Sequence, residues 1–240
     1  MSEDDRPVGE IVEGWNTPPW PFDVKLEGTH VRLDPLSVSK HASALFEAYS
    51  DAGWLWDYLP DGPYEELEDY EAWMRAAVSH GDTLFLAIID RASGRPVGIA
   101  SYLRINPSAG SIEVGNINFS PKLQRQVGAT EAMALMMAWA FDAGYRRYEW
   151  KCNALNAPSR RAAQRLGFSF EGVFRQAMVV KGRNRDTAWF AMTDQDWPGI
   201  KKAMSQWLSS GNFEANGQQR ERLGDLTAPF RVSSDPSLAD

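Results

Sequence analysis

Three apolar runs separated by short turns constrain the fold of this chain more than any other feature. The runs read TLFLAIID, PVGIASYLRI and SIEVGNINF (83–90, 96–105 and 111–119), and the turns between them contain RASG and NPSAG. A parallel crossover needs a dozen or more residues, whereas these connections are far shorter. The pattern therefore predicts three neighbouring antiparallel strands.

Helical periodicity flanks these strands on both sides. Apolar residues recur every three or four positions after Gly128 and stop at DAGY, and Pro158 and Gly167 bracket a shorter helix. An earlier strand covers 29–36 and a later one 146–152, and residues 168–193 read as a closing hairpin. This order predicts an α+β fold with a mixed, mostly antiparallel twisted sheet. Its expected helices cover 37–50, 65–80, 128–142, 156–167 and 194–208.

Composition along the chain predicts one folded domain with two extensions. Residues 1–28 are rich in Pro and Trp and predict an extended arm, residues 29–208 carry the domain, and residues 209–240 predict a polar, flexible tail. The sequence contains no run of about 18 apolar residues, so no membrane span is expected. The N-terminus lacks the pattern of a secretory signal, and the single Cys152 suits a reducing cytoplasm. Three histidines and one cysteine show no metal-ligand spacing, so no metal is expected.

Charge is unevenly distributed. The net charge of −7 argues against nucleic acid as a partner. Between Lys122 and Arg185, however, 12 basic residues face only 4 acidic ones. This segment is either a solvated basic face or a pocket for a small polyanion.

The stretch NINFSPKLQRQVGATEAM (116–133) reads as a strand, a polar loop and the start of a helix. A helix N-terminus presents unpaired N–H groups and partial positive charge, which suit an anion. Gly128 and Ala129 would let a ligand approach the backbone closely. An ordinary strand-to-helix turn would show the same pattern.

A second motif, NAPSRRAAQRLGF (156–168), follows the next strand. With it, the chain resembles the GNAT (Gcn5-related) N-acetyltransferases, in particular the branch that is RimJ/RimL-like. Gln124, Val127 and Ala129 stand at the three key positions of the family's pyrophosphate loop. Val127 replaces a glycine of that pattern, so φ there must be negative. Gly128 could take over the flexible position.

The resemblance implies a GNAT-type sheet whose strands separate at an acetyl-coenzyme A (acetyl-CoA) site, and acetyl-CoA as the co-substrate. Asn156 would reach the pantetheine, Ser159 the sulfur, and the backbone of Phe119 the pantetheine amides. Arg125, Arg160 and Arg161 would meet the outer phosphates, or remain solvated. The implied cofactor-binding residues are Ile117, Phe119, Gln124, Arg125, Val127, Gly128, Ala129, Thr130, Asn156, Ser159 and Arg161.

The implied reaction is direct transfer of acetyl to an amine, either a protein N-terminal α-amine or a small-molecule amine. Glu113 is the candidate general base, and strand alternation predicts that it shares a face with Ile117 and Phe119 while Asn118 points the other way. Ser159 is the candidate acid, because the family's usual tyrosine is missing; it could equally cap its helix.

The loop 51–64 would line the acceptor site through Trp54, Trp56 and Tyr58 together with Asn118, or serve packing alone. A binding module without catalysis is the alternative function. The Trp-rich arm suggests a homodimer.

Overall fold

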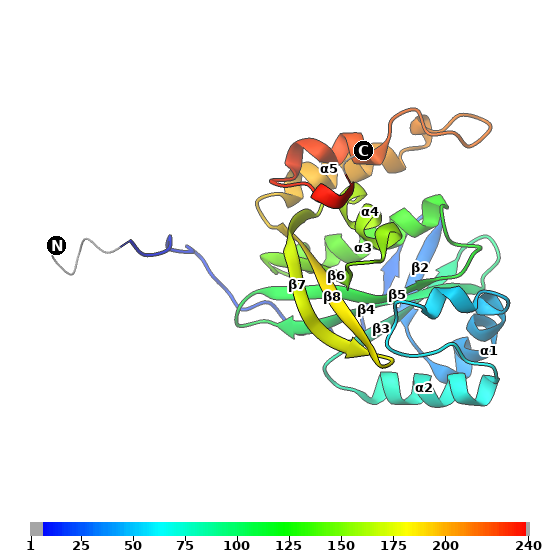
Figure 1. Ribbon diagram of the computed structural model, residues 1–240. Coiled ribbons are helices and arrows are strands. Elements are labelled where there is room, and N and C mark those ends of the chain that lie inside the picture. The colour runs from blue at the N-terminus through cyan, green and yellow to red at the C-terminus, as the bar shows by residue number, and fades with distance from the viewer. Residues whose placement is uncertain (1–6, 239–240) are drawn as a thin grey trace.

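The computed structural model describes residues 7–238 and contains an eight-stranded sheet over that range (Figure 1). The strands are ordered β1-β2-β3-β4-β5-β6-β8-β7, and only β5 and β6 pair in parallel among those described. The α+β prediction is confirmed. The strand bounds are β1 Leu26–Glu27, β2 Val31–Pro35, β3 Leu84–Asp90, β4 Pro96–Asn106, β5 Ser111–Phe119, β6 Arg147–Asn153, β7 Ser169–Val180 and β8 Arg183–Thr193.

Helices cover both faces of the sheet (Figure 1). Helices α1 and α2 share one apolar cluster with β3 and β4, whereas α3 and α5 share a larger cluster on the opposite face. The short helix α4 follows β6, and a 3₁₀ turn, η2, covers Gly53–Trp56. The helix bounds are α1 Val38–Tyr49, α2 Leu67–Ser79, α3 Val127–Asp142, α4 Ala157–Arg165, α5 Trp197–Leu208 and α6 Leu223–Thr227.

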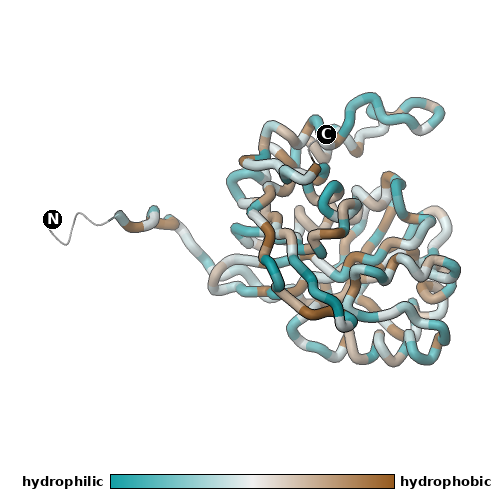
Figure 2. Tube along the Cα trace, viewed as in Figure 1, coloured by the Kyte–Doolittle hydropathy of each residue, from teal (hydrophilic) through white to brown (hydrophobic). Residues whose placement is uncertain are grey.

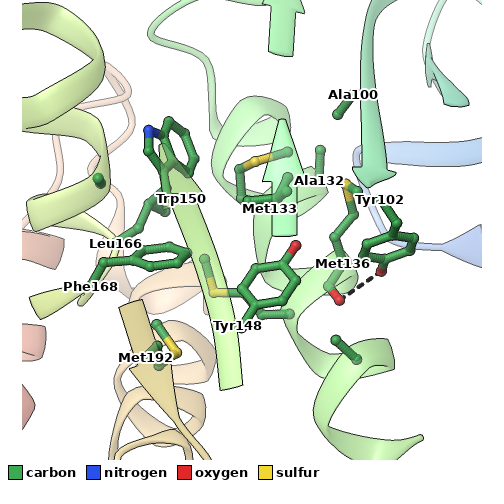
Figure 3. Packing of buried hydrophobic residues seen from close by; sticks show 14 of the residues in the cluster. Ala100, Tyr102, Ala132, Met133, Met136, Tyr148, Trp150, Leu166, Phe168 and Met192 are labelled. Carbon is green, nitrogen blue, oxygen red and sulfur yellow. Dashed lines mark hydrogen bonds between the residues drawn. The ribbon is translucent and has the colours of Figure 1, made fainter. Parts of the chain in front are cut away.

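The larger cluster joins α3 to the middle of the sheet (Figure 3). Met133 and Met136 of α3 pack towards Tyr102 and Tyr148, and all four side chains are buried. The Tyr102 hydroxyl donates to the carbonyl of Met136 at 2.7 Å, which satisfies the one polar atom of that side chain. This packing fixes the start of α3 relative to β5, and so positions the loop between them.

A β-bulge in β5 changes which side chains share a face. Asn116 has φ of 50°, and the β4–β5 register shifts between Ile99 and Ser101. An extra residue inverts the alternation beyond it. Ile117 and Phe119 therefore pack on the α3 cluster. Asn118, paired with Ile99 of the α1–α2 cluster, lies on the face of Glu113. The predicted shared face of Glu113, Ile117 and Phe119 is wrong for this reason.

The C-terminal segment 209–238 packs on the domain, in contrast to the expected flexible tail. Leu223 and Thr227 are fully buried, and Asp235 is buried against Arg160 of α4. Figure 2 shows this segment as mostly hydrophilic, which explains the expectation. A few anchors at wide intervals hold the segment, and average polarity does not reveal them.

The N-terminal arm extends away from the domain (Figure 1). It is tied to the domain where the Tyr145 hydroxyl donates to the carbonyl of Pro19 at 3.0 Å. Trp15 packs near Gly110 and beneath the guanidinium of Arg146. Residues 1–6 of the predicted arm lie outside the described range.

Candidate active site

Strands β5 and β6 separate halfway along their length. They pair only from Ser111 to Val114 and from Arg147 to Trp150. Beyond that point β5 continues against β4, while β6 continues against β8. Within the described sheet, the edge of β5 over residues 115–119 therefore has no strand partner on the β6 side. The result is an opening in the sheet flanked by backbone hydrogen-bonding groups.

The loop that follows β5 places unpaired N–H groups at the mouth of this opening. Among residues 7–238, no acceptor is found for the N–H groups of Arg125, Val127 and Gly128. Arg125 has φ of 61°, an unfavourable conformation for a residue with a side chain. Gln124 fixes the loop, since its side-chain amide donates to the carbonyl of Phe119 at 2.9 Å. The arrangement is that of an anion-binding helix end.

Gly128 serves a different purpose from the predicted one. It lies within α3, and Arg125 rather than Gly128 carries the positive φ. A Cβ at Gly128 would lie 2.9 Å from Cγ1 of Val31, so the missing side chain permits helix–strand packing. Val127 is the first residue of α3 and, as expected, is not among the residues with positive φ. The larger residue at this position is tolerated because the loop turns at Arg125.

Helix α4 holds its two predicted residues by internal contacts. The side-chain carbonyl of Asn156 caps the helix by accepting from the N–H of Ser159 at 3.1 Å. The Ser159 hydroxyl oxygen accepts from the indole N–H of Trp150 at 3.1 Å, so its own proton points elsewhere, and the Cys152 thiol is within its reach. Burial raises the pKa of the neighbouring Cys152 thiol. Trp150 thus sets the direction of the Ser159 hydroxyl.

Two other predicted phosphate ligands are already engaged. The Thr130 hydroxyl accepts from both terminal nitrogens of Arg165 at 3.2 Å, which connects α3 to α4. Arg160, expected near a phosphate, forms a buried ion pair with Asp235 instead. Arg161 is exposed and Ala129 is half-buried beside the loop. Arg125 and Arg161 therefore remain the arginines available to an outer phosphate.

Glu113 lies at the centre of a charged network. Its side chain is 3% exposed; Oε1 accepts from Nη1 of Arg104 at 2.6 Å and Oε2 lies 2.8 Å from Nζ of Lys151. Burial raises the pKa of the Glu113 carboxyl, although both cations oppose the shift. Lys151 also contacts Glu149 at 2.7 Å and lies 3.8 Å from the centre of the Trp189 ring. Residue type alone did not predict Lys151, Glu149 or Trp189; the alternation of β6 and β8 is the signal that aligns them.

Of the aromatic residues predicted to line the acceptor site, one is buried in the core and two are at least partly exposed. Trp56 is buried and packs edge-on against Tyr49 and Tyr64, so it is a core residue. Trp54 is 56% exposed. The hydroxyl of Tyr58 donates to the carbonyl of Leu155 at 3.3 Å, so this loop contacts the one before α4.

The β7–β8 hairpin contacts the loop 51–64, which was predicted to line the acceptor site. Lys181 Nζ donates to the carbonyl of Trp56 at 2.9 Å. Asn118, which was also predicted to line the acceptor site, is 2% exposed, and neither polar atom of its amide has a partner within residues 7–238. Its backbone carbonyl accepts from the Tyr49 hydroxyl at 2.9 Å.

A cavity of about 450 Å³ lies beside the start of α3, lined by Lys122, Gln126, Val127 and Gly128 together with His30 and Arg95. Across residues 7–238, no cluster of His, Cys, Asp or Glu is suited to a metal ion. None of the described helices is long and apolar enough to cross a membrane.

Known proteins share this arrangement. Residues 30–169 match the model of the acetyltransferase (GNAT) domain family. A GCN5-related N-acetyltransferase from Brucella melitensis is 46% identical over 90% of this chain and 100% of its own, with a TM-score of 0.88. A probable acetyltransferase of the GNAT family from Chromobacterium violaceum is 39% identical over 80% and 98%, with a TM-score of 0.77.

A more distant structure has the same fold. The acetyltransferase from Salmonella typhimurium that modifies the N-terminal serine of ribosomal protein L7/L12 is 22% identical over 69% of this chain and 96% of its own, with a TM-score of 0.60. No curated protein matches the chain.

The split sheet and the helix end beside it, in a fold shared with acetyltransferases, define an acyl-transfer enzyme. The chain belongs to the GNAT family of N-acetyltransferases, and its fold is shared with RimL-like members.

Proposed function

We propose that this chain transfers acetyl from acetyl-CoA directly to an amine, either the α-amine of a protein or a small-molecule amine. The observation that carries the proposal is the separation of β5 from β6 beside the unpaired N–H groups at the start of α3. The free edge of β5 can pair with an extended amide-bearing arm, and the helix end suits a diphosphate. The pantetheine arm and the diphosphate of acetyl-CoA would therefore each meet complementary groups.

The carrier supplies an activated thioester, whose thiol leaves readily because its pKa is about 8.5. Glu113 would take the proton of the attacking amine, since its raised pKa makes it a better base than an exposed carboxylate. Its Oε2 lies 2.8 Å from Nζ of Lys151, and a carboxylate oxygen has a second lone pair that can still accept the amine proton. Lys151 retains Glu149 as a partner if Glu113 is protonated. Ser159, held by Trp150, would donate to the leaving sulfur.

Calorimetry with coenzyme A and thiol release from acetyl-CoA test the proposal. Arg125→Gly should weaken binding of coenzyme A but leave binding of S-acetylpantetheine, which lacks the phosphates, unchanged. Asp51→Gly is the matched control, because Asp51 is also exposed and has φ of 61° but lies outside the loop between β5 and α3. Tight coenzyme A binding without turnover of any amine would favour the binding module. Absence of binding at millimolar coenzyme A would refute the site itself.

A further inference from the structure

Arg185 is a half-buried guanidinium for which the chain supplies no carboxylate. No acidic group of residues 7–238 lies within the 4.0 Å of an ion pair, and its Nε is buried without a hydrogen-bond partner. Burial lowers the pKa of the Arg185 guanidinium. An arginine is almost never fully buried unless it is paired, and a donor shielded from water without an acceptor is unfavourable. The unmatched arginine therefore calls for a partner from outside the chain.

Strand β8 directs Arg185 to the face of the sheet that carries Glu113. Trp189 pairs with Lys151 across β6–β8 and lies beneath its ammonium group. Arg185 and Thr187 stand four and two positions before Trp189, so all three share that face. Ala188, Phe190 and Met192 point instead into the α3 cluster. Cys152, Arg104 and Glu113 are, in this order of strength, close enough for their charges to act on Arg185.

The acidic residues of β5, β6 and β8 contact other groups. Glu113 contacts Arg104 and Lys151, and Glu149 contacts Lys151 and Arg147. Asp186 accepts from the N–H of Gln176 and the amide of Asn184. The positive charge of Arg185 is thus unmatched on the face where the proposed base lies.

Further unused donors accompany Arg185. The hydroxyl of Thr187 and the indole N–H of Trp189 are buried and have no acceptor in the described chain. At the tip of the same hairpin, four positions before Arg185, Lys181 contacts the carbonyl of Trp56 in the loop of the proposed acceptor site.

We infer that Arg185 binds a carboxylate of the acceptor, so that the preferred substrate is an amine whose own molecule carries a carboxylate. This inference rests on the proposed acetyl transfer and names its substrate class. A guanidinium binds a carboxylate through two parallel hydrogen bonds, which fixes orientation as well as charge. The carboxylate belongs either to a free amino acid or to an acidic side chain next to a peptide α-amine, two sources that the experiment separates.

The experiment compares paired acceptors with and without a carboxylate, and kcat/KM is referred to the concentration of neutral amine so that the different α-amine pKa values do not enter the ratio. Thiol release is measured with each amino acid and its carboxamide, and with tetrapeptides carrying Asp or Asn at the second position. The wild-type protein should favour the carboxylate member in kcat/KM by on the order of 10- to 100-fold, the range of a charged hydrogen bond. The two arms of the panel separate free amino acids from acidic peptides.

Arg185→Gln should bring the ratio of kcat/KM values towards one by raising KM for carboxylates, with the amides unchanged. Arg185→Lys should restore part of the preference. Arg183→Gln is the control, since Arg183 is exposed and stands two positions before Arg185 on β8, so the two share a face of the strand. The melting temperature of Arg185→Gln should not fall, because an unpaired charge is removed; a fall would indicate a structural role.

Equal wild-type rates with both members of every pair, or an equal loss for both in Arg185→Gln, would overturn the inference while acetyl transfer stood. A second readout does not need turnover. In the presence of coenzyme A, N-acetyl amino acids should bind more tightly than N-acetyl amino acid amides to wild type, and equally to Arg185→Gln. Absence of thiol release with every amine would refute the proposed function, and binding without that preference would refute the inference.

Discussion

The ion pair between α4 and the C-terminal segment offers the most demanding test of this structure. Arg160 Nε and Nη2 donate to the two oxygens of Asp235, each at 2.6 Å, and Nη1 donates to the carbonyl of Ala154 at 2.8 Å. The Asp235 side chain is 0% exposed and that of Arg160 is 10% exposed. Asp235→Asn keeps the shape, removes the charge and directs an amide donor at the guanidinium.

The expected loss follows from burial. Breaking a buried ion pair on one side costs about 3–5 kcal/mol. For a domain of this size, each kcal/mol lowers Tm by about 2–4 °C, which gives roughly 6–20 °C if unfolding remains all-or-none. If the C-terminal segment detaches by itself, the fall in Tm will be smaller, because local opening exposes the unpaired charge to water. Trypsin would reveal that route by cleaving after Arg222 or Arg231, both within the segment.

The assay combines thermal unfolding with limited proteolysis, and Asp225→Asn is the control because Asp225 is exposed on α6. Arg160→Met with Asp235→Leu should recover most of the loss by removing both charges. Burial raises the pKa of Asp235, but the hydrogen bonds from Arg160 outweigh it and leave that pKa below its usual value. The pair therefore stabilises the fold above about pH 4 and ceases to do so as pH falls through the folded pKa. An unchanged Tm together with an unchanged cleavage pattern would refute the reasoning.

Three further predictions concern α3, β5 and α4. Glu113→Gln should lower kcat by on the order of 10²- to 10⁴-fold and remove the rise of kcat/KM with pH, which in wild type should occur above the usual pKa of a glutamate; coenzyme A affinity should not change, and a wild-type pH profile would exclude the base role. Ser159→Ala and Trp150→Phe both remove the 3.1 Å hydrogen bond and should cost about 1–3 kcal/mol of stability; Ser159→Ala should also lower kcat if the hydroxyl is the acid, and Trp150→Phe should lower kcat less, because the hydroxyl remains but is no longer oriented. Glu131→Gln should lower Tm by several degrees, because the carboxylate accepts the N–H groups of Thr29, His30 and Val31 at 2.6–2.8 Å; thermal unfolding with no shift would contradict this.

The sequence predicted most of the fold because its elements are short-range features. The meander of β3, β4 and β5 follows from turns too short for a crossover, and α4 follows from Pro158 and Gly167. The C-terminal segment escaped prediction for the opposite reason. Its anchors pair residues far apart in the chain, such as Arg160 with Asp235, and each looks solvated when read alone.

The site was predictable where backbone carries it and less so where side chains do. The helix end at Val127 depends on a strand–loop–helix order that is visible in the sequence. The flexible position expected at Gly128 lies at Arg125 instead, and the packing of Gly128 on Val31 escaped prediction because Val31 lies almost 100 residues earlier. Arg160 was a candidate for an outer phosphate, but Asp235 already engages it, and the hydroxyl of Thr130, an implied cofactor-binding residue, is engaged by Arg165. Residue type indicates which groups can bind an anion, and only the fold shows which of them are free.

The bulge at Asn116 has the widest consequence for the site. One extra residue moves Asn118, rather than Ile117, to the face that carries Glu113. A polar amide without a partner in the described residues and a buried carboxylate are then on the side of the proposed acceptor site, while Ile117 and Phe119 pack towards α3 on the other. Since alternation without the bulge would exchange these two sets, the bulge determines the polarity of both faces of β5. A single left-handed residue thus separates an apolar side from a side suited to proton transfer.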